Sequence, residues 1–380
     1  MEFLFWLLVF ICVYGYIGYP LVLAIITPFF SRYRHLPQSI SAGPSVSILV
    51  AAYNEEDYIA TKIASLLNQT YPDACFDIWI LNDGSDDRTA EIVKSFKDDR
   101  VNLINLPRGG KGTALNIGIA SSSNEIVVFS DADNEWTENT LMRLISPFSL
   151  SSVGVVSGQL SIRENSKHLG MGDRLYRQYE GFIRKCETKL GNAVSADGGI
   201  FAIRRALYQN LPQDVTDDFY ISTGAVLGGH SLVYQESAVA YDDGVDSAGN
   251  QLRRRIRVTV RGMTSLWRRR ELFNIFSYGT YSFCLFSHKL VRRFVPFFAT
   301  LLFPMNLMVL GSGGFYVALF FIQVCFYCTA LAGLIDGGNR LPKLFSIAGF
   351  ILLSSFGLAA GIVQFLLGKR FTFWSPEDNR

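Results

Sequence analysis

Ile126-Val127-Val128-Phe129-Ser130-Asp131-Ala132-Asp133 is a short apolar run that ends in two carboxylates. Short β-branched runs of this kind are typical of buried strands. The sequence before it predicts three more strands, at 45–52, 76–81 and 101–106, and helices from about 59, from 89 to 96 and from 113 to 120. Strands that alternate with helices predict an α/β domain with a parallel sheet.

Polar side chains follow three of these strands at the point where each strand ends. They are Asn54 and Glu55, then Asp83, then Asp131 and Asp133. Ligands of parallel sheets bind beyond the carboxyl ends of the strands, so we expect these residues to share one crevice. Mg²⁺ characteristically binds one or two carboxylates together with phosphate oxygens. Asp131 and Asp133 therefore predict a divalent-cation site that neutralises a departing diphosphate, although acids spaced in this way also occur in solvated turns.

Apolar segments of membrane length flank this central domain. Of the 380 residues, 49% are hydrophobic and 18% charged, and residues 3–30 carry no charge. A bilayer-spanning helix needs ~20 apolar residues. A secretory signal peptide is excluded because the segment begins Met1-Glu2 and is bulky and aromatic throughout. We therefore expect a retained anchor over residues 1–31, followed by a central domain over 44–270.

Two uncharged stretches, 294–335 and 344–368, predict three more membrane helices within 294–368, with a break at 311–314 and a tail at 369–380. Basic residues favour cytoplasmic loops, and Arg32, Arg34 and Arg340 lie on one side if four helices alternate. The sequence therefore predicts an integral, multi-pass protein of the inner or plasma membrane with a cytoplasmic catalytic domain. Three or five spans stay open.

The segment 271–293 is rich in aromatic residues but interrupted by polar ones. This composition predicts an interfacial amphipathic segment, with an ordinary core helix as the alternative. Eight arginines fall between Arg253 and Arg270, beside a membrane segment, while the formal net charge is only +2. We expect membrane lipids rather than nucleic acid as the partner of this basic stretch. The six cysteines and four histidines are too scattered to indicate a metal cluster.

Six motifs within 46–270 together resemble the membrane-bound family 2 glycosyltransferases, which include chitin, hyaluronan, cellulose and poly-N-acetylglucosamine synthases. They are Ala51-Ala52-Tyr53-Asn54-Glu55, Asn82-Asp83-Gly84-Ser85, Lys111-Gly112-Thr113-Ala114-Leu115-Asn116, Ser130-Asp131-Ala132-Asp133, Thr216-Asp217-Asp218 and Arg254-Arg255-Ile256-Arg257. Each motif alone is common, but their order and spacing are specific. The resemblance implies an α/β fold, a GT-A (Rossmann-like) glycosyltransferase domain with flanking transmembrane helices.

The resemblance implies a nucleotide-sugar site at the strand ends. Asn54, Glu55 and Asp83 are expected to contact the nucleotide, and Lys111 to lie on the nucleotide side of the cleft. Asp131 and Asp133 are expected to hold the diphosphate and its Mg²⁺ or Mn²⁺. For Lys111 the alternative is a solvent-facing loop cation. The phosphate-loop spacing GxxxxGK[ST] is absent around it.

Thr216-Asp217-Asp218 stands where the family carries Thr-Glu-Asp, whose last acid is the catalytic base. The resemblance therefore makes Asp218 the candidate base, within ~3 Å of the acceptor hydroxyl that it deprotonates. A single displacement then inverts the anomeric carbon. A purely structural helix cap is the alternative for this pair.

The resemblance places Gly198, Gly199 and Asp217 on the acceptor side, where glycines let a sugar approach the backbone. A simple turn into a strand is the alternative for the glycines. Processive synthases carry Gln-x-x-Arg-Trp on an interfacial helix, whereas this chain has Val258 in the position of the tryptophan. Arg257 can still pair with phosphate, so polymer extension is less directly implied than sugar transfer.

Three functions are compatible with these observations. The leading hypothesis is an inverting transferase that moves a sugar from a UDP-sugar, UDP-GlcNAc or UDP-glucose, to a growing surface, capsular or exopolysaccharide. The second is single-sugar transfer to a polyprenyl phosphate or another lipid acceptor, which the missing aromatic residue favours. The third is a non-catalytic membrane protein that senses nucleotide sugars, for which the acids must be dispensable.

Overall fold

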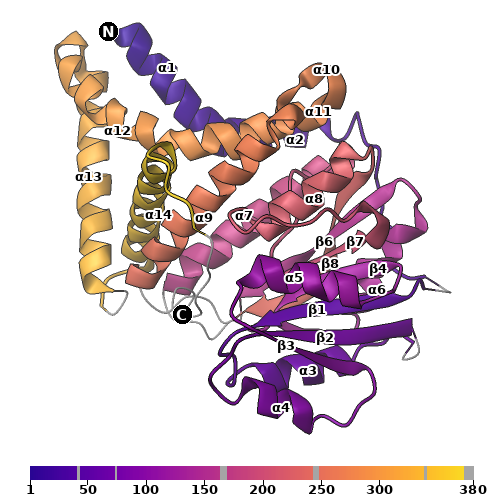
Figure 1. The fold of residues 1–380 in the computed structure, drawn as a ribbon. Helices are drawn as coiled ribbons and strands as arrows, with labels where there is room; N and C mark the ends of the chain where they lie inside the picture. Colours follow the sequence, from indigo (N-terminus) through magenta and orange to yellow (C-terminus); the bar gives the residue numbers. More distant parts are fainter. Residues whose placement is uncertain (41–42, 73–74, 163–168, 243–247, 338–339, 372–380) are drawn as a thin grey trace.

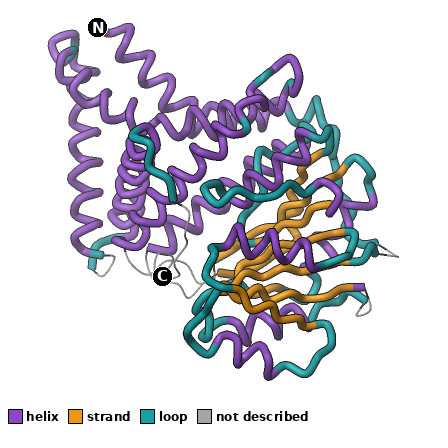
Figure 2. Tube along the Cα trace, viewed as in Figure 1, coloured by secondary structure: helices purple, strands orange, loops and turns teal. Residues whose placement is uncertain are grey.

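The computed structural model describes residues 1–380 except 41–42, 73–74, 163–168, 243–247, 338–339 and 372–380. An α/β domain built on one sheet lies beside a layer of long helices formed by the two ends of the chain (Figure 1). Figure 2 shows the strands gathered in one part of the molecule, with helices on both sides of them. The N-terminal helix α1 lies with the C-terminal helices α12 and α13 in the helical layer.

In the residues that the structure describes, the sheet has eight strands in the order β3-β2-β1-β4-β7-β6-β8-β5. Their bounds are β1 Val46–Ala52, β2 Phe76–Asp83, β3 Val101–Leu106, β4 Ile126–Asp131, β5 Glu135–Trp136, β6 Val153–Ile162, β7 Ile200–Arg204 and β8 Ser231–Asp242. The first four strands are parallel, as the sequence predicts, but β7 is antiparallel to both β4 and β6. The sheet is therefore mixed, because β7 begins with Ile200 opposite Ser130 at the end of β4 and runs back alongside that strand.

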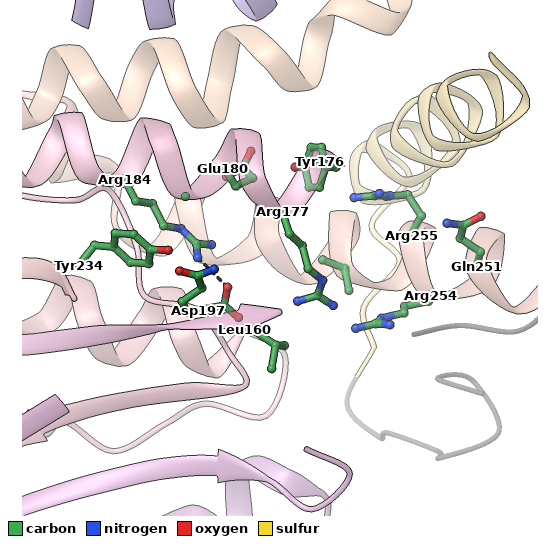
Figure 3. A pocket seen from close by; sticks show the side chains of 13 residues that line it. Leu160, Tyr176, Arg177, Glu180, Arg184, Asp197, Tyr234, Gln251, Arg254 and Arg255 are labelled. Carbon is green, nitrogen blue, oxygen red and sulfur yellow. Dashed lines mark hydrogen bonds and ion pairs between the residues drawn. The ribbon is translucent and has the colours of Figure 1, made fainter. Parts of the chain in front are cut away.

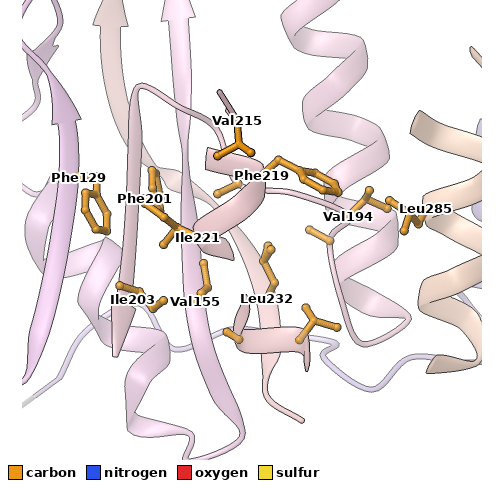
Figure 4. Close-up of a cluster of buried hydrophobic side chains, with 14 of the residues drawn as sticks. Phe129, Val155, Val194, Phe201, Ile203, Val215, Phe219, Ile221, Leu232 and Leu285 are labelled. Carbon is orange, nitrogen blue, oxygen red and sulfur yellow. The ribbon is translucent and has the colours of Figure 1, made fainter. Parts of the chain in front are cut away.

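Alternating side chains of the strands enter two cores, one on each face of the sheet. Leu49, Leu81 and Phe129 pack toward α5 (Lys111–Ser121), α7 (Leu169–Lys189) and α8 (Asp217–Leu227). Ile48, Val50 and Ile78 pack on the other face, toward α3 (Ile59–Leu67), α4 (Thr89–Ser95) and α6 (Thr140–Ile145). Figure 4 shows the first core, where the rings of Phe129 and Phe201 stack at 4.7 Å. Helices cover both faces of the sheet, so the ends of the strands are the part of the sheet that stays accessible.

Within the described residues, four helical runs are long and apolar enough to cross a membrane: Glu2–Ile26, Thr280–Met308, Gly314–Asp336 and Lys343–Leu366. They comprise α1 (Glu2–Val13), η1 (Tyr14–Gly18), α2 (Tyr19–Ile26), α11 (Thr280–Leu285), η6 (Phe286–Val291), α12 (Arg292–Met308), α13 (Gly314–Asp336) and α14 (Lys343–Leu366). Short helices complete the chain: η3 (Ser146–Ser149), η4 (Arg205–Leu207), η5 (Arg270–Phe273), α10 (Ile275–Tyr278) and η7 (Leu310–Ser312).

One predicted boundary differs from the structure. The expected interfacial segment 271–293 contains the short helices η5 and α10, but from Thr280 the chain is one helical run that continues to Met308 without a break at 293. The polar residues that interrupt the apolar pattern are turned inward: Nδ1 of His288 lies 2.7 Å from the carboxylate of Glu187 on α7. Because these groups are paired inside the protein, the helix can be long despite its composition.

The helical layer and the sheet domain share contacts through α7 and α9 (Ala248–Arg268). Helix α14 lies against α9 so closely that a Cβ on Gly361 would be 2.6 Å from the Cβ of Thr259. Leu285 of α11 belongs to the core under the sheet, and the hydroxyl of Tyr281 donates to the carbonyl of Val194 (2.9 Å). The face of the sheet that carries α7 and α8 therefore packs toward the helical layer.

Candidate active site

A cavity of about 250 Å³ lies where the predicted motifs meet. Its lining residues are Ala51, Glu55, Lys111, Asp131, Ala132, Asp133, Leu160, Arg177, Asp197, Gly198, Gly199, Thr216, Asp217, Asp218, Arg254, Arg257, Val258 and Arg261. They come from the ends of β1 and β4, the start of α5, β6, α7, the loop before β7, the start of α8 and one face of α9. All of the predicted site residues line this cavity except Asn54 and Asp83.

Asp83 and Asn54 hold loops beside the cavity. The buried carboxylate of Asp83 accepts the backbone N–H groups of Gly109 (2.8 Å) and Gly110 (3.0 Å) and pairs with Arg108. Gly110 has φ +85°, a conformation that favours glycine, and it precedes Lys111 at the start of α5. Asn54 has φ +54°, and its side chain accepts the N–H of Asp86 (3.0 Å). Their contact with a nucleotide stays a prediction.

Lys111 joins two groups of acids. Its Nζ lies 2.7 Å from an oxygen of Asp131 and 2.7 Å from an oxygen of Asp217. Burial alone would lower the pKa of Lys111, but Asp131 and Asp217 outweigh it and hold the pKa above its ordinary value. Lys111 is thus a paired cation inside the cavity and not a solvent-facing loop residue.

Asp131 and Asp133 form the metal-binding candidate. Burial and the nearby carboxylates of Asp242 and Asp131 raise the pKa of Asp133 to about 7, although the charge of Arg254 acts in the opposite direction. In the part of the chain that the structure describes, no group of three or more His, Cys, Asp or Glu residues could hold a metal. Two carboxylates would leave the other coordination positions to phosphate oxygens and water, as Mg²⁺ prefers. These residues fit a divalent cation bound together with a diphosphate.

A buried lysine, Lys62, holds the segment that carries Asp131 and Asp133. Nζ of Lys62 donates to the side-chain oxygens of Ser130 (2.6 Å) and Asn134 (2.6 Å), and the amide of Asn134 donates to the carbonyl of Gly199 (2.9 Å). Burial lowers the pKa of Lys62 to about 7 despite the nearby acids Asp131 and Asp133. The sequence analysis missed Lys62, although its place between Ile59 and Leu66 on the apolar face of α3 was a signal.

Asp217 and Asp218 occupy the first turn of α8. The N-cap residue is Thr216, whose side chain makes no cap hydrogen bond. Burial would raise the pKa of Asp217, but Lys111 outweighs it and lowers that pKa. Burial and the charge of Asp217 raise the pKa of Asp218. A Cβ on Gly198 would lie 3.8 Å from the Cβ of Asp218, so the glycine loop faces the candidate base.

Helix α9 presents a row of arginines to the cavity. Arg254, Arg257 and Arg261 follow one another at spacings of three and four, which places them on one helical face. Nε of Arg261 donates to the carbonyl of Val215 (2.9 Å) just ahead of α8, and the charge of Arg254 acts to lower the pKa of Asp133. Arg257 is buried. From the sequence, a phosphate-binding role was predicted only for Arg257 of this row, although Arg254 belongs to the same motif and the helical spacing also indicates Arg261.

Sequence comparison finds glycosyltransferases among known proteins. Residues 47–211 match the family described as Glycosyl transferase family 2. The chain is 29% identical over 222 residues to poly-beta-1,6-N-acetyl-D-glucosamine synthase of Staphylococcus epidermidis, covering 56% of this chain and 53% of that protein. It is 32% identical over 186 residues to beta-monoglucosyldiacylglycerol synthase of Nostoc sp., covering 47% of this chain and 40% of that protein. The chain thus spans about half the length of the curated relatives it matches or less.

A comparison with solved structures also finds a sugar-transferring enzyme. A mannosyltransferase from Pyrobaculum calidifontis, solved in complex with GDP-Man and Mn²⁺, superimposes with a TM-score of 0.73 at 18% identity, covering 97% of this chain and 99% of that one. The family and the fold class predicted from the motifs are confirmed. Residues 47–211 are a family 2 glycosyltransferase domain, and the sheet domain that contains them has the GT-A fold.

Proposed function

We propose that this protein is a membrane-bound, inverting glycosyltransferase that adds a sugar from a UDP-sugar, UDP-GlcNAc or UDP-glucose, to a growing surface polysaccharide. The observation that carries the proposal is one cavity lined by the metal-binding candidates Asp131 and Asp133, the candidate base Asp218 and the cations Lys111 and Arg257. The relationship to a poly-beta-1,6-N-acetyl-D-glucosamine synthase supports polysaccharide as the product.

The donor side of the cavity holds the diphosphate. Lys111 and the arginine row of α9 supply positive charge for it, and guanidinium groups bind phosphate oxygens in pairs. Asp131 and Asp133 would hold Mg²⁺ or Mn²⁺, which when bound neutralises charge on the leaving diphosphate. The Mn²⁺ bound to the structural neighbour supports this assignment.

The acceptor side performs the proton transfer. Asp218 takes the proton of the acceptor hydroxyl, whose oxygen attacks the anomeric carbon while the bond from that carbon to the diphosphate breaks. The raised pKa of Asp218 makes its carboxylate a stronger base than an ordinary aspartate. A single displacement of this kind inverts the anomeric centre. Gly198, opposite Asp218, leaves room for the acceptor sugar, whereas a Cβ on Gly199 would lie 2.7 Å from the side chain of Leu160.

The four apolar helical runs support an integral membrane location, with the sheet domain on the cytoplasmic side where nucleotide sugars are available. A second candidate function, transfer to a lipid acceptor, is favoured by Val258, which lines the cavity in place of an aromatic platform. The relationship to a beta-monoglucosyldiacylglycerol synthase also supports it.

The proposal is tested with the full chain in purified membranes. Labelled UDP-GlcNAc and UDP-glucose are supplied, and the products are separated by size. We expect transfer that stops with a chelator, returns with Mn²⁺ or Mg²⁺, and falls at least about 100-fold when Asp131 and Asp133 are both changed to Asn. The matched control is Asp99→Asn, an exposed acid outside the cavity. Equal transfer by the double variant and the control would contradict the proposal, and a lipid-linked monosaccharide as sole product would favour the second candidate.

A further inference from the structure

Two more cavities continue from the catalytic cavity toward the helical layer. A middle cavity of about 260 Å³ shares Leu160, Arg177, Asp197, Arg254 and Val258 with the catalytic cavity. A membrane-side cavity of about 520 Å³ shares Tyr176, Glu180, Arg255 and Val258 with the middle one. Figure 3 shows the middle cavity between Asp197, at the catalytic end, and Tyr176 and Arg255 beside α14. Val258 lines all three, so the cavities form one path from Asp218 to the membrane helices.

The membrane-side cavity carries an excess of positive charge. Among its lining residues are four cations, Arg255, Lys289, Arg292 and Arg293, and a single acid, Glu180. The carboxylate of Glu180 is shared between Arg292 (2.7 Å) and His288 (3.0 Å). One carboxylate cannot balance four cations, so the cavity is suited to an anion.

Two arginines of this cavity hold buried donors that make no hydrogen bond to any residue in the described part of the chain. Nη1 of Arg292 and Nη1 of Arg293 are both buried without a partner, and Arg292 is only 6% exposed. Leaving a buried charged donor without a hydrogen-bond acceptor is unfavourable, so such groups are normally paired. A ligand with several acceptor oxygens would satisfy both donors, and a phosphate offers these in the geometry that guanidinium groups prefer.

The remaining wall of the cavity is apolar and belongs to a candidate membrane helix. Phe350, Ile351 and Leu358 of α14 line it, and Ile351 is 47% exposed, so this wall reaches the outer surface of the helical layer. A hydrocarbon chain can lie against such a wall while its phosphate meets the arginines. The middle cavity is different, because Gln159, Gln251 and Tyr234 offer hydrogen-bonding groups and an aromatic ring, which suit a sugar.

We propose that the acceptor is a lipid-linked saccharide whose linking phosphate binds Arg255, Lys289, Arg292 and Arg293 in the membrane-side cavity. The proposal rests on the function above, because the saccharide extends through the middle cavity and presents its hydroxyl to Asp218. In the transfer step that hydroxyl loses its proton to Asp218, its oxygen bonds to the anomeric carbon, and the bond to the diphosphate breaks. The lipid phosphate stays intact.

The test compares two acceptors that differ only in the linker. One is N-acetylglucosamine joined to a phytanyl chain by a phosphodiester, and the other is the same sugar on the same chain through an ether. With the full-length protein and the UDP-sugar that the membrane assay identifies, we expect kcat/KM to be at least about 10-fold higher for the phosphodiester. In Arg293→Gln this preference should fall toward one, whereas Arg340→Gln, an exposed cation outside the cavity, should retain it. Because the readout is a ratio within each variant, partial misfolding cannot imitate the effect.

Three outcomes would overturn the inference. Equal or better use of the ether acceptor would show that the cavity does not recognise phosphate, while the transferase activity itself stands. Preference for the phosphodiester that Arg293→Gln leaves unchanged would place phosphate recognition elsewhere. If phosphatidylglycerol in the vesicles binds the cavity but the two acceptors are used equally, the site holds a structural lipid and not the acceptor. Loss of all sugar transfer from UDP-sugars would instead refute the proposed function.

Discussion

Asp217 and Asp218 are adjacent, yet their surroundings give them different roles. Lys111 holds Asp217 in an ion pair and lowers its pKa, whereas burial and the charge of Asp217 raise the pKa of Asp218. A carboxylate held by a lysine is a weak proton acceptor, and a buried carboxylate beside another acid is a stronger one. The geometry therefore favours the second acid of the pair as the base.

The raised pKa of Asp218 predicts where activity is lost in acid. Its ionised form is the base, so kcat falls as the pH drops through that pKa, which lies above the ordinary aspartate value of about 3.9. The same shift has a consequence for stability, because ionising a group whose folded-state pKa is raised weakens the fold as the pH rises. We expect Asp218→Asn to unfold at the same or a higher temperature than wild type at neutral pH. An acidic limb of kcat at or below pH 4, or marked destabilisation by this substitution, would contradict this account.

Lys62 is a positioning residue behind the metal-binding loop. Lys62→Met leaves Ser130 and Asn134 without their buried donor, at a cost of about 1–3 kcal/mol. Asn134 also donates to the carbonyl of Gly199. We therefore expect the variant to have both a lower apparent affinity for Mn²⁺ and a higher KM for the donor. Titration of activity with Mn²⁺ measures this effect, with Lys94→Met on the exposed side of α4 as the control. Lost thermal stability with unchanged metal and donor dependence would show a purely structural role.

Different sides of helix α9 line the catalytic cavity and the membrane-side cavity. Arg254, Arg257 and Arg261 face the catalytic cavity, while Arg255 and Thr259 face the membrane-side cavity. This division explains why the helix carries so many arginines without the Gln-x-x-Arg-Trp pattern. A basic stretch that the sequence assigned to phosphate or to lipid headgroups can bind both.

Arg257→Ala tests the donor side of α9. Hydrogen bonds between charged groups contribute about 1.5–3 kcal/mol, so losing one to the diphosphate should raise the donor KM by at least about 10-fold. Arg253→Ala, on an exposed position of the same helix, should change it much less. Initial rates over a range of UDP-sugar concentrations separate KM from kcat. A donor KM equal in the two variants would remove Arg257 from the nucleotide site.

The contact between α14 and α9 requires a small residue. A Cβ on Gly361 would lie 2.6 Å from the Cβ of Thr259, whereas a Cβ on Gly311 would meet nothing within 4 Å. Overpacking a close contact costs about 1–3 kcal/mol, so Gly361→Ala should lower the melting temperature in detergent while Gly311→Ala should not. Activity should fall with the first variant because α9 carries residues of the site. Equal melting temperatures for the two variants would show that α14 and α9 can move apart without loss of stability.

At the scale of the whole molecule, the pattern of apolar runs in the sequence predicted strands β1 to β4, whose ends form the proposed donor site. The strands from Val46 to Asp131 are apolar runs whose ends carry the motifs, and each of them is found within about two residues of its predicted bounds. The strands after residue 150 were not assigned, and the antiparallel return of β7 depends on contacts with both β4 and β6 that lie far apart in the sequence.

Long-range pairing also explains what the sequence could not show. His288 looks like an interruption of an apolar helix until Glu187 and Glu180, about 100 residues away, are placed beside it. Lys62 appears as an ordinary helical lysine until Ser130 and Asn134 surround its amine. Asp83, which the sequence places at the nucleotide, also binds the loop that precedes Lys111. In each case the partner is distant in sequence, and a single chain without its fold does not identify it.

The proposed mechanism requires that Asp218 acts as the base and that other residues bind the UDP-sugar donor. The most direct measurement is the rate of sugar transfer by Asp218→Asn, combined with donor binding by the same protein in one calorimetric titration with Mn²⁺. We predict that transfer falls by about 100-fold or more while the Kd for the UDP-sugar stays within about 3-fold of wild type, because Asp131, Asp133 and Arg257 remain in place. Transfer at the wild-type rate by this variant would contradict the account.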